Sequence, residues 1–374
     1  MQSPHVWFGM RILAFLLLAA PAVAAQSVAL DSTIRVTWGA YVDAYYAYDL
    51  GRPASFDRAF TTQAARSNEF NVNLAHVEAV IAGARVRGRL AVQAGTAVHA
   101  NYASEPTIGA VSGSTLARHL QEAYVGYRVS ERLWIDAGIF FSTAGAEGWI
   151  SSENLTYSRS LVADYSPYYA SGVRAVFQAS PQLTARVDLI NGWQNISETN
   201  SGKALASRLD YSPRERVILS HYAYVGPEQA GHVRVFTGLS ATAAISPALR
   251  VQAEADVGRQ ERDGGGHDPW SGGALTAHWT FRPHTALVLR GEWYRDPRQV
   301  LIATGQPFGL RATGASIGLD VAPVAGLRWR SELRTLEAVN AVFPTRENTS
   351  GMSRANVVFM TGISLTVREA PRVE

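Results

Sequence analysis

The side chains best suited to chemistry lie in one stretch of the chain that has no apolar periodicity. Residues 142–160 read STAGAEGWISSENLTYSRS, with two glutamates, Glu147 and Glu153, and one arginine, Arg159. A pair of carboxylates can act as general acid and general base, so a catalytic loop is the first hypothesis for this stretch. The segments on both sides alternate apolar and polar residues. What those segments build decides which chemistry the loop can do.

Other catalytic signatures are weak. The histidines are scattered, and none stands in a metal-binding spacing such as H-E-x-x-H. No nucleophile elbow is predicted. The run DGGGHD at residues 263–268 has neither the strand–loop–helix setting of a P-loop nor the ligand spacing of an EF-hand. We therefore predict no enzyme activity and assign no catalytic, cofactor-binding or metal-binding residue.

The composition and the first residues indicate an exported protein. Charged residues make up 17% of the 374 residues, against about 25% in an average soluble domain, and there is no cysteine. Arg11 precedes the apolar run ILAFLLLAAPAVA and small residues follow, which is the pattern of a cleaved signal peptide over residues 1–25. The net charge of +3 is too mild to predict nucleic-acid binding. Residues 26–374 are expected to form a single domain.

The mature region alternates apolar and polar residues almost throughout, which is the periodicity of β-strands. Residues 86–102, 249–258 and 327–333 are clear examples. Most of these segments exceed the roughly five or six residues usual for a soluble strand and reach about 9 to 11, the length of a tilted membrane strand. The pattern therefore predicts an all-β fold, a transmembrane antiparallel up-and-down β-barrel.

The spacing of the turns predicts the number of strands. Short turns, many with proline, are expected near residues 84, 130, 180–181, 212–213, 246–247, 283–284 and 323–324. Longer connections alternate with them at residues 51–66, 104–116, 143–166, 195–202, 226–230, 261–268, 297–307 and 339–353. These fifteen connections join sixteen strands, and short turns opposite longer loops are typical of bacterial outer-membrane barrels. Irregular alternation at residues 70–81 and 216–225 predicts β-bulges there.

Aromatic residues are expected to form two belts on the apolar face, one at each membrane interface. The belt near the short turns comprises Tyr127, Trp134, Phe177, Tyr211, Phe281 and Trp329. The belt near the longer loops comprises Tyr46, Tyr48, Tyr102, Phe141, Trp193 and Trp293. A barrel of sixteen strands leaves an aqueous channel, whereas side chains can fill a barrel of eight.

The polar face of the strands would line that channel, and it is rich in arginine. The expected pore-lining residues are Arg87, Arg89, Arg186, Arg250, Glu254, Arg290, Glu292, Arg328, Arg330 and Arg334. Rings of arginine favour anions in pores, so weak anion selectivity is one interpretation. The other is that inward charges of both signs pair with each other and only keep the lumen wet.

Several short motifs around the opening stretch resemble one known family. The runs LWIDAGIFFSTAGAEGWISSENLTYSRSL, SPYYASGVRAVF and VDLINGWQNI carry the likeness. The matching positions are Gly138, Gly145, Glu147, Asn154, Tyr157, Ser158, Arg159, Ser160, Pro167, Tyr168, Gly172, Asn191, Gly192 and Trp193. Over roughly residues 130–230 the chain resembles the OmpL-like putative β-barrel porin family. The resemblance implies a bacterial outer-membrane pore for small hydrophilic solutes, and it supplies no catalytic residues.

Counting turns makes residues 143–166 the third long loop, between the fifth and sixth strands. In sixteen-stranded porins this loop typically folds into the lumen and narrows it. The expected constriction residues are Glu147, Glu153, Tyr157, Arg159 and Asp164. Their acidic groups would face the arginine-rich wall and orient dipolar solutes. An external loop with solvated charges is the alternative.

The leading hypothesis is a passive, water-filled diffusion channel in the outer membrane of a Gram-negative bacterium. It would need no cofactor. Its partners would be outer-membrane lipid, small hydrophilic solutes and, during biogenesis, the barrel-assembly machinery; a monomer and a homotrimer both stay open. The alternatives are a barrel enzyme that hydrolyses lipid or peptide, and a surface adhesion or receptor barrel with a closed lumen. The last expected strand, residues 356–367, is followed by a polar tail, whereas such barrels commonly end on an aromatic residue.

Overall fold

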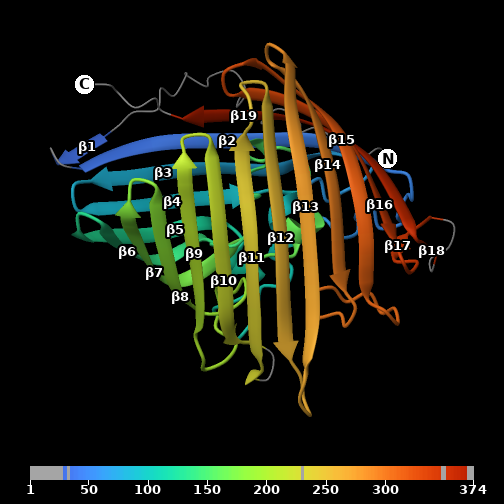
Figure 1. Cartoon of the computed structure of the whole chain (residues 1–374), viewed down its shortest axis with the longest axis horizontal. Helices are drawn as coiled ribbons and strands as arrows, with labels where there is room; N and C mark the ends of the chain where they lie inside the picture. Colours follow the sequence, from blue (N-terminus) through green and yellow to red (C-terminus); the bar gives the residue numbers. More distant parts are fainter. Residues whose placement is uncertain (1–27, 32–33, 229–230, 347–350, 369–374) are drawn as a thin grey trace, which may run out of the picture.

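A closed β-barrel accounts for most of the chain. The computed structural model describes residues 28–31, 34–228, 231–346 and 351–368, so the expected signal peptide lies outside the described residues. Within them, sixteen antiparallel strands each pair with the next strand along the barrel, and the last pairs with the first (Figure 1). The predicted all-β barrel and its strand number are confirmed.

The barrel strands are long. They are β2 (Ile34–Asp49), β3 (Glu69–Gly83), β4 (Val86–Ala94), β5 (Leu120–Ser130), β6 (Leu133–Phe141), β7 (Tyr169–Ser180), β8 (Leu183–Ile190), β9 (Ala204–Arg214), β10 (Val217–Pro227), β11 (Val233–Ala244), β12 (Leu249–Glu261), β13 (His267–Arg282), β14 (Thr285–Asp296), β15 (Leu310–Val324), β16 (Leu327–Ala338) and β19 (Ala355–Arg368). A further short strand, β1 (Val28–Asp31), pairs with the start of β2. In the described part of the chain, no helix is long and apolar enough to cross a membrane.

The closure between β19 and β2 satisfies the backbone of both strands. Eleven residue pairs lie opposite each other there, from Val358 and Asp49 to Arg368 and Gly39. Hydrocarbon offers no water to unpaired N–H and C=O groups, and a closed barrel leaves no strand edge. The two faces of the wall differ accordingly. On β12, Val257 points outward and is 55% exposed, whereas Asp256 beside it is 3% exposed.

One predicted strand is too long. Residues 86–102 do not form one strand, because β4 ends at Ala94 and the helix α1 (Thr96–Asn101) follows. Between them, Gly95 has a φ of 138°, which glycine adopts readily, and an added Cβ would lie 2.3 Å from the carbonyl oxygen of Asn73. The alternation of residues 96–102 is therefore incidental.

Two short turns also lie a few residues beyond their predicted positions, at residues 215–216 and 325–326. The prolines taken as turn residues, Pro213 and Pro323, are inside β9 and β15. Beside each of them the strand register shifts. A β-bulge tolerates proline because one residue there is left out of the ladder of hydrogen bonds. The prolines thus mark bulges next to the turns.

One of the two predicted irregularities is confirmed. The register between β2 and β3 shifts after Asp43, so Asn73 is the extra residue on β3. The side chain of Asn73 turns inward and donates to the Asp43 carboxylate at 2.8 Å. The irregularity predicted for residues 216–225 is wrong, because β10 pairs with β11 in unbroken register and the extra residue of its pairing with β9 lies on β9.

The aromatic belts are confirmed only in part. Tyr127 and Trp329, near the short turns, are 50% and 56% exposed on the outer face. Trp134 instead faces the lumen, where the Arg87 guanidinium lies 4.5 Å from its ring centroid. Tyr102 and Trp193 also belong to the interior, because neither lies on a barrel strand and each packs against buried aromatic residues. These three were predicted to face the lipid, and that prediction is wrong.

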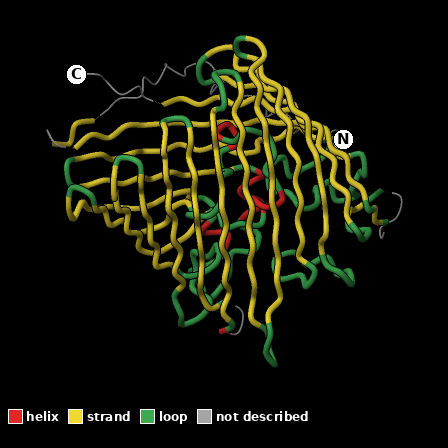
Figure 2. The backbone as a smooth tube through the Cα atoms, in the orientation of Figure 1, coloured by secondary structure: helices red, strands yellow, loops and turns green. Residues whose placement is uncertain are grey.

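The longer connections gather at one end of the barrel, and we call this the loop end and the other the turn end. We name the connections used below L1 (50–68), L2 (95–119), L3 (142–168), L4 (191–203), L5 (228–232) and L7 (297–309). L2 holds α1 and α2 (Ser114–Ala117), while L3 holds the 3-10 turn η1 (Ser151–Glu153) and α3 (Leu161–Asp164). The last long connection carries the small hairpin β17 (Phe343–Pro344) and β18 (Met352–Ser353). Figure 2 shows helices inside the outline of the strands.

Candidate functional site in the barrel lumen

L3 runs into the lumen, and carboxylates of the barrel wall hold its backbone. The loop has no strand partner, so its N–H groups need acceptors from elsewhere. The N–H of Ser158 donates to Glu332 on β16 at 2.8 Å. The N–H of Ala146 donates to Glu254 on β12, also at 2.8 Å. These contacts with separate parts of the wall place L3 across the lumen.

Wall arginines hold the carbonyl groups of the same loop. Arg290 on β14 donates to the carbonyl oxygen of Ser158 at 2.7 Å. Arg330 on β16 donates to the carbonyl oxygen of Thr156 at 2.9 Å. Hydrogen bonds from a charged donor are stronger than neutral ones, and each guanidinium offers five N–H groups. The arginines therefore fix the course of L3 as well as line the lumen.

A buried ion-pair cluster lies behind these contacts. Arg334 donates two hydrogen bonds to Glu292, at 2.8 and 2.7 Å, and Arg290 lies 3.1 Å from Glu332. These side chains are at most 2% exposed. Glu292 also accepts from the N–H of Leu161 at 2.7 Å. Removing one member of such a buried pair typically costs about 3–5 kcal/mol, because the remaining charge is left without compensation.

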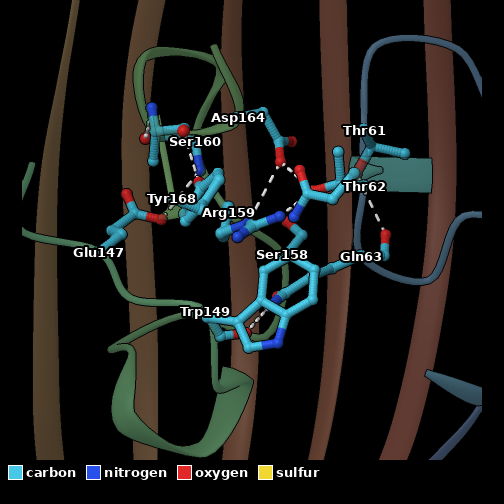
Figure 3. Close-up of polar contacts among 12 residues, drawn as sticks. Thr61, Thr62, Gln63, Glu147, Trp149, Ser158, Arg159, Ser160, Asp164 and Tyr168 are labelled. Atoms are coloured by element: carbon cyan, nitrogen blue, oxygen red, sulfur yellow. Dashed lines mark hydrogen bonds and ion pairs between the residues drawn. The ribbon is translucent and has the colours of Figure 1, made fainter. Parts of the chain in front are cut away.

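L1 also folds inward and meets L3 in a polar contact (Figure 3). The hydroxyl of Thr62 donates to Asp164 Oδ1 at 2.5 Å and accepts a hydrogen bond from Arg159. Arg159 also donates to Asp164 Oδ1, at 3.2 Å. The Gln63 amide donates to the carbonyl oxygen of Trp149 at 3.0 Å. We call this set the L1–L3 contact.

Arg159 is at the centre of that contact and is fully buried. Its guanidinium carbon lies 3.6 Å from the ring centroid of Tyr168 and 5.2 Å from that of Trp149. A cation over an aromatic face is stabilised by about 2 kcal/mol when it is removed from water. Asp164 supplies the compensating charge. Arg159, which the sequence predicted to line the constriction, is therefore held inside L3 by Asp164 and two aromatic rings.

Glu147 and Tyr157 lie in the same buried part of L3. Glu147 Oε2 accepts from the N–H of Ser160 at 2.9 Å, and burial raises the pKa of this carboxyl above its usual range. The Tyr157 hydroxyl donates to Asp43 on β2 at 3.2 Å. Glu147 therefore stabilises the loop from within, and Tyr157 fastens it to the wall.

Glu153 lies apart from the other predicted loop residues. It is exposed and pairs with Arg368, near the end of β19, at 2.9 Å. Beside it, the carbonyl oxygen of Ser152 accepts from Arg328, at the start of β16, at 3.0 Å. Both arginines stand at the turn end of the barrel. L3 therefore descends from the loop end through most of the lumen.

The remaining predicted pore-lining residues stand on the inner wall, mostly beside carboxylates. Arg89 contacts Glu78 and Glu122, and Arg250 is exposed at the turn end. The other pairs at the turn end are Arg87 with Asp136 (2.6 Å), Arg186 with Asp210 (3.3 Å) and Arg328 with Asp320 (3.4 Å). In each of these three pairs the arginine is more exposed than its partner.

Sequence reasoning missed the inward course of L1. Arg58 on this loop donates to the carbonyl oxygen of Ala64 at 2.7 Å and also contacts the sulfur of Met360 on β19. Burial lowers the pKa of Arg58 to about 10. The sequence of L1 looks like that of an ordinary polar loop, because residues that hold L1 in the lumen, such as Met360, are distant in the chain. Only an excess of arginine between apolar strands hinted at interior contacts.

One serine motif needs correction. Residues 314–318 read GASIG and so match G-x-S-x-G, although no nucleophile elbow was predicted. Such an elbow is a strained turn between a strand and a helix. Ser316 instead lies in the middle of β15, in regular register with Arg290 and Arg334. Across the described residues, no three His, Cys, Asp or Glu side chains are grouped so as to hold a metal ion.

A family model covers most of the chain. The model described as "Putative beta-barrel porin-2, OmpL-like" matches residues 35–366. This range begins in β2 and ends in β19, so it includes every strand of the barrel. No curated protein sequence matches the chain significantly.

Solved outer-membrane channels share the fold at low sequence identity. The channel DcaP of Acinetobacter baumannii superposes with a TM-score of 0.61 at 11% identity, over 92% of this chain and 100% of that one. An anion-selective porin from Comamonas acidovorans gives 0.58 at 10% identity, over 89% and 100%. OmpF of Salmonella typhi, in complex with daunomycin, gives 0.57 at 10% identity, over 91% and 100%.

Proposed function

Since the chain belongs to the OmpL-like family "Putative beta-barrel porin-2" of the bacterial outer membrane, we propose that it forms a passive, water-filled diffusion channel for small hydrophilic solutes. The observation that carries this proposal is the charge on the inner wall beneath an apolar outer face, where the partly exposed arginines Arg87, Arg186 and Arg328 pair with carboxylates. Polar interiors of this kind are filled with water in porins. The chain would do no covalent chemistry.

L3 would be the constriction of this channel. Its buried residues Glu147, Tyr157, Arg159 and Asp164 would narrow the lumen. The contacts of Ser158 and Ala146 with the wall support this role, because they hold the loop across the lumen.

We also propose that the channel is weakly selective for anions. At the turn end, the arginines of the wall are more exposed than the carboxylates beside them. Exposed charges at a pore mouth attract counter-ions. The Comamonas acidovorans protein with the same fold is described as anion-selective, which is a property of that protein.

Single-channel conductance in a planar bilayer tests the channel and its constriction together. The folded full-length chain should conduct, and deletion of residues 146–160 should raise the conductance because this segment occupies the lumen. Deletion of Gly264, Gly265 and Gly266, in an exposed loop at the loop end, is the control and should change little. Equal conductance of the L3 deletion and the parent chain would contradict the constriction.

A closed-lumen barrel is the second candidate, and the burial of L1 and L3 favours it. Arg159 and the ion-pair cluster are almost fully inaccessible, as in a plugged barrel. Such a chain would serve adhesion or reception at the cell surface. Heat-modifiable gel migration would show that the protein is folded. A folded protein that never conducts at any voltage would favour this candidate over the channel.

A further inference from the structure

A cavity at the loop end lies above the floor formed by L3. Its volume is about 620 Å³, within the roughly 300–1,000 Å³ range of small-molecule sites. L1, L2, L3, L4, L5 and L7 all contribute to its lining. Six separate segments thus converge on one space, and a solute that enters from the loop end meets this space before the constriction.

Two residues that line the cavity carry buried polar atoms without partners. Asp164 Oδ2 and Asn101 Nδ2 have no hydrogen-bond partner within the described residues, although the side chain of Asp164 is only 1% exposed and Asn101 only 4%. Figure 3 shows that the contacts of Asp164 with L1 and Arg159 use its other oxygen. A buried polar group without a partner is destabilising, so it calls for a ligand. One group accepts hydrogen bonds and the other donates them.

The charges around the cavity balance. Arg159 compensates the charge of Asp164 from behind the cavity wall, at 3.2 Å. Arg234, which lines the cavity, lies 3.9 Å from Glu228 and donates to the side chain of Gln260 at 2.9 Å. A ligand with a net charge would find no uncompensated charge of the opposite sign. The site therefore favours a neutral molecule.

Aromatic surface completes the lining. Trp193 on L4 and Tyr165 on L3 both border the cavity and are only partly buried. The Trp193 ring is held in place by edge contacts with Phe236 and Trp270, with centroids 4.9 and 6.1 Å away. A fixed aromatic ring beside donors and acceptors suits a ligand that has both C–H faces and hydroxyl groups.

We propose that this cavity binds a neutral polyhydroxylated solute, a mono- or disaccharide, before its passage through the barrel. Each sugar hydroxyl donates and accepts, so one ligand can satisfy both Asp164 Oδ2 and Asn101 Nδ2. This inference names the class of solute that the proposed channel would carry. The passage of the sugar rests on the proposed channel function, whereas binding of the sugar requires only the folded barrel.

Binding of sucrose by the full-length protein, folded in detergent micelles, tests the proposal by isothermal titration calorimetry. Sodium gluconate and glycine serve as charged and zwitterionic comparators. Sucrose should bind saturably and more tightly than either comparator. Asn101→Leu removes the unpartnered donor and should weaken sucrose binding about tenfold, the effect of one good hydrogen bond in a buried site.

Asn340→Leu is the matched control, since Asn340 also has an unpartnered amide but lies outside the cavity. This variant should bind sucrose as the parent does, and gel migration with and without heating checks that both variants fold. Absence of saturable sucrose binding, equal binding of gluconate, or equal behaviour of the two variants would overturn the proposal. Conductance recorded on the same preparation separates the failures. Sucrose binding without conductance would overturn the channel alone, and conductance without sucrose binding would overturn the sugar site alone.

Discussion

Glu147 shows how one buried carboxyl couples the lumen to pH. It lies within L3, its carboxylate accepts from the N–H of Ser160, and burial raises its pKa. A group whose pKa is raised by folding stabilises the folded state fully below its unfolded pKa, about 4.3, and this contribution is lost as the pH rises through the higher folded pKa. L3 should therefore be held more firmly at acid pH than at neutral pH.

Glu147→Gln tests this coupling, because glutamine keeps the size and the acceptor oxygen but cannot ionise. Hydrogen exchange of the L3 amides, corrected for intrinsic rates, should show protection that falls with rising pH in the parent chain. The fall should be smaller in Glu147→Gln. Glu153→Gln changes an exposed glutamate of the same loop and should leave the parent behaviour intact. If Glu147→Gln keeps the full pH dependence, another group is responsible.

At the scale of elements, the L1–L3 contact links two loops that are far apart in the chain. Thr62 provides both a donor to Asp164 and an acceptor for Arg159. Thr62→Val keeps the shape and removes both hydrogen bonds, at a cost of about 1.5–3 kcal/mol for bonds to charged groups. L1 amides should then exchange at least about tenfold faster, because local opening becomes easier. Hydrogen exchange with mass spectrometry measures this.

Thr61→Val is the control for that variant. The Thr61 hydroxyl donates only within L1, to the carbonyl oxygen of Gln63 at 3.1 Å. Its loss should leave the contact with L3 in place and change exchange in L1 much less. Equal acceleration in the two variants would mean that L1 is held by its own packing and not by L3.

The elements differ in how far the sequence predicts them. Strands such as β12 follow from period-two alternation, because successive side chains face lipid and lumen in turn. The helix α1 was read as strand, since six residues are too few to separate a helical period from alternation. The inward course of L1 depends on Thr62 meeting Asp164, 102 residues away, and no local pattern encodes such a contact.

The site was predictable to a similar degree. The alternation of side chains along each strand is enough to assign the arginines of the polar face to the lumen. The structure places Arg290, Arg330 and Arg334 there. Their partners could not be assigned, because an arginine that lines water and one that holds a loop carbonyl have the same local sequence. Arg330, which holds the carbonyl oxygen of Thr156, is an example.

At the scale of the whole molecule, the balance of exposed charge at the turn end should decide ion selectivity. The side chain of Arg186 is 36% exposed and that of its partner Asp210 is 18% exposed, while Arg87 and Arg328 are each 30% exposed against 6% for their carboxylate partners. Arg250 adds a further exposed positive charge on the same wall. The mouth of the barrel therefore has an excess of accessible positive charge, although the buried part of the wall is nearly balanced.

The expected outcome is a modest preference for anions, measured as the reversal potential across a salt gradient. An anion-to-cation permeability ratio below about tenfold corresponds to less than about 1.4 kcal/mol, which is reasonable for charges screened over about 10 Å at 0.1 M salt. Arg250→Gln should move the ratio towards one. Arg262→Gln removes an arginine at the loop end that pairs with Asp268, and it should leave the ratio unchanged. A clear preference for cations in the parent chain would contradict this prediction, because the wall carboxylates would then outweigh the more exposed arginines.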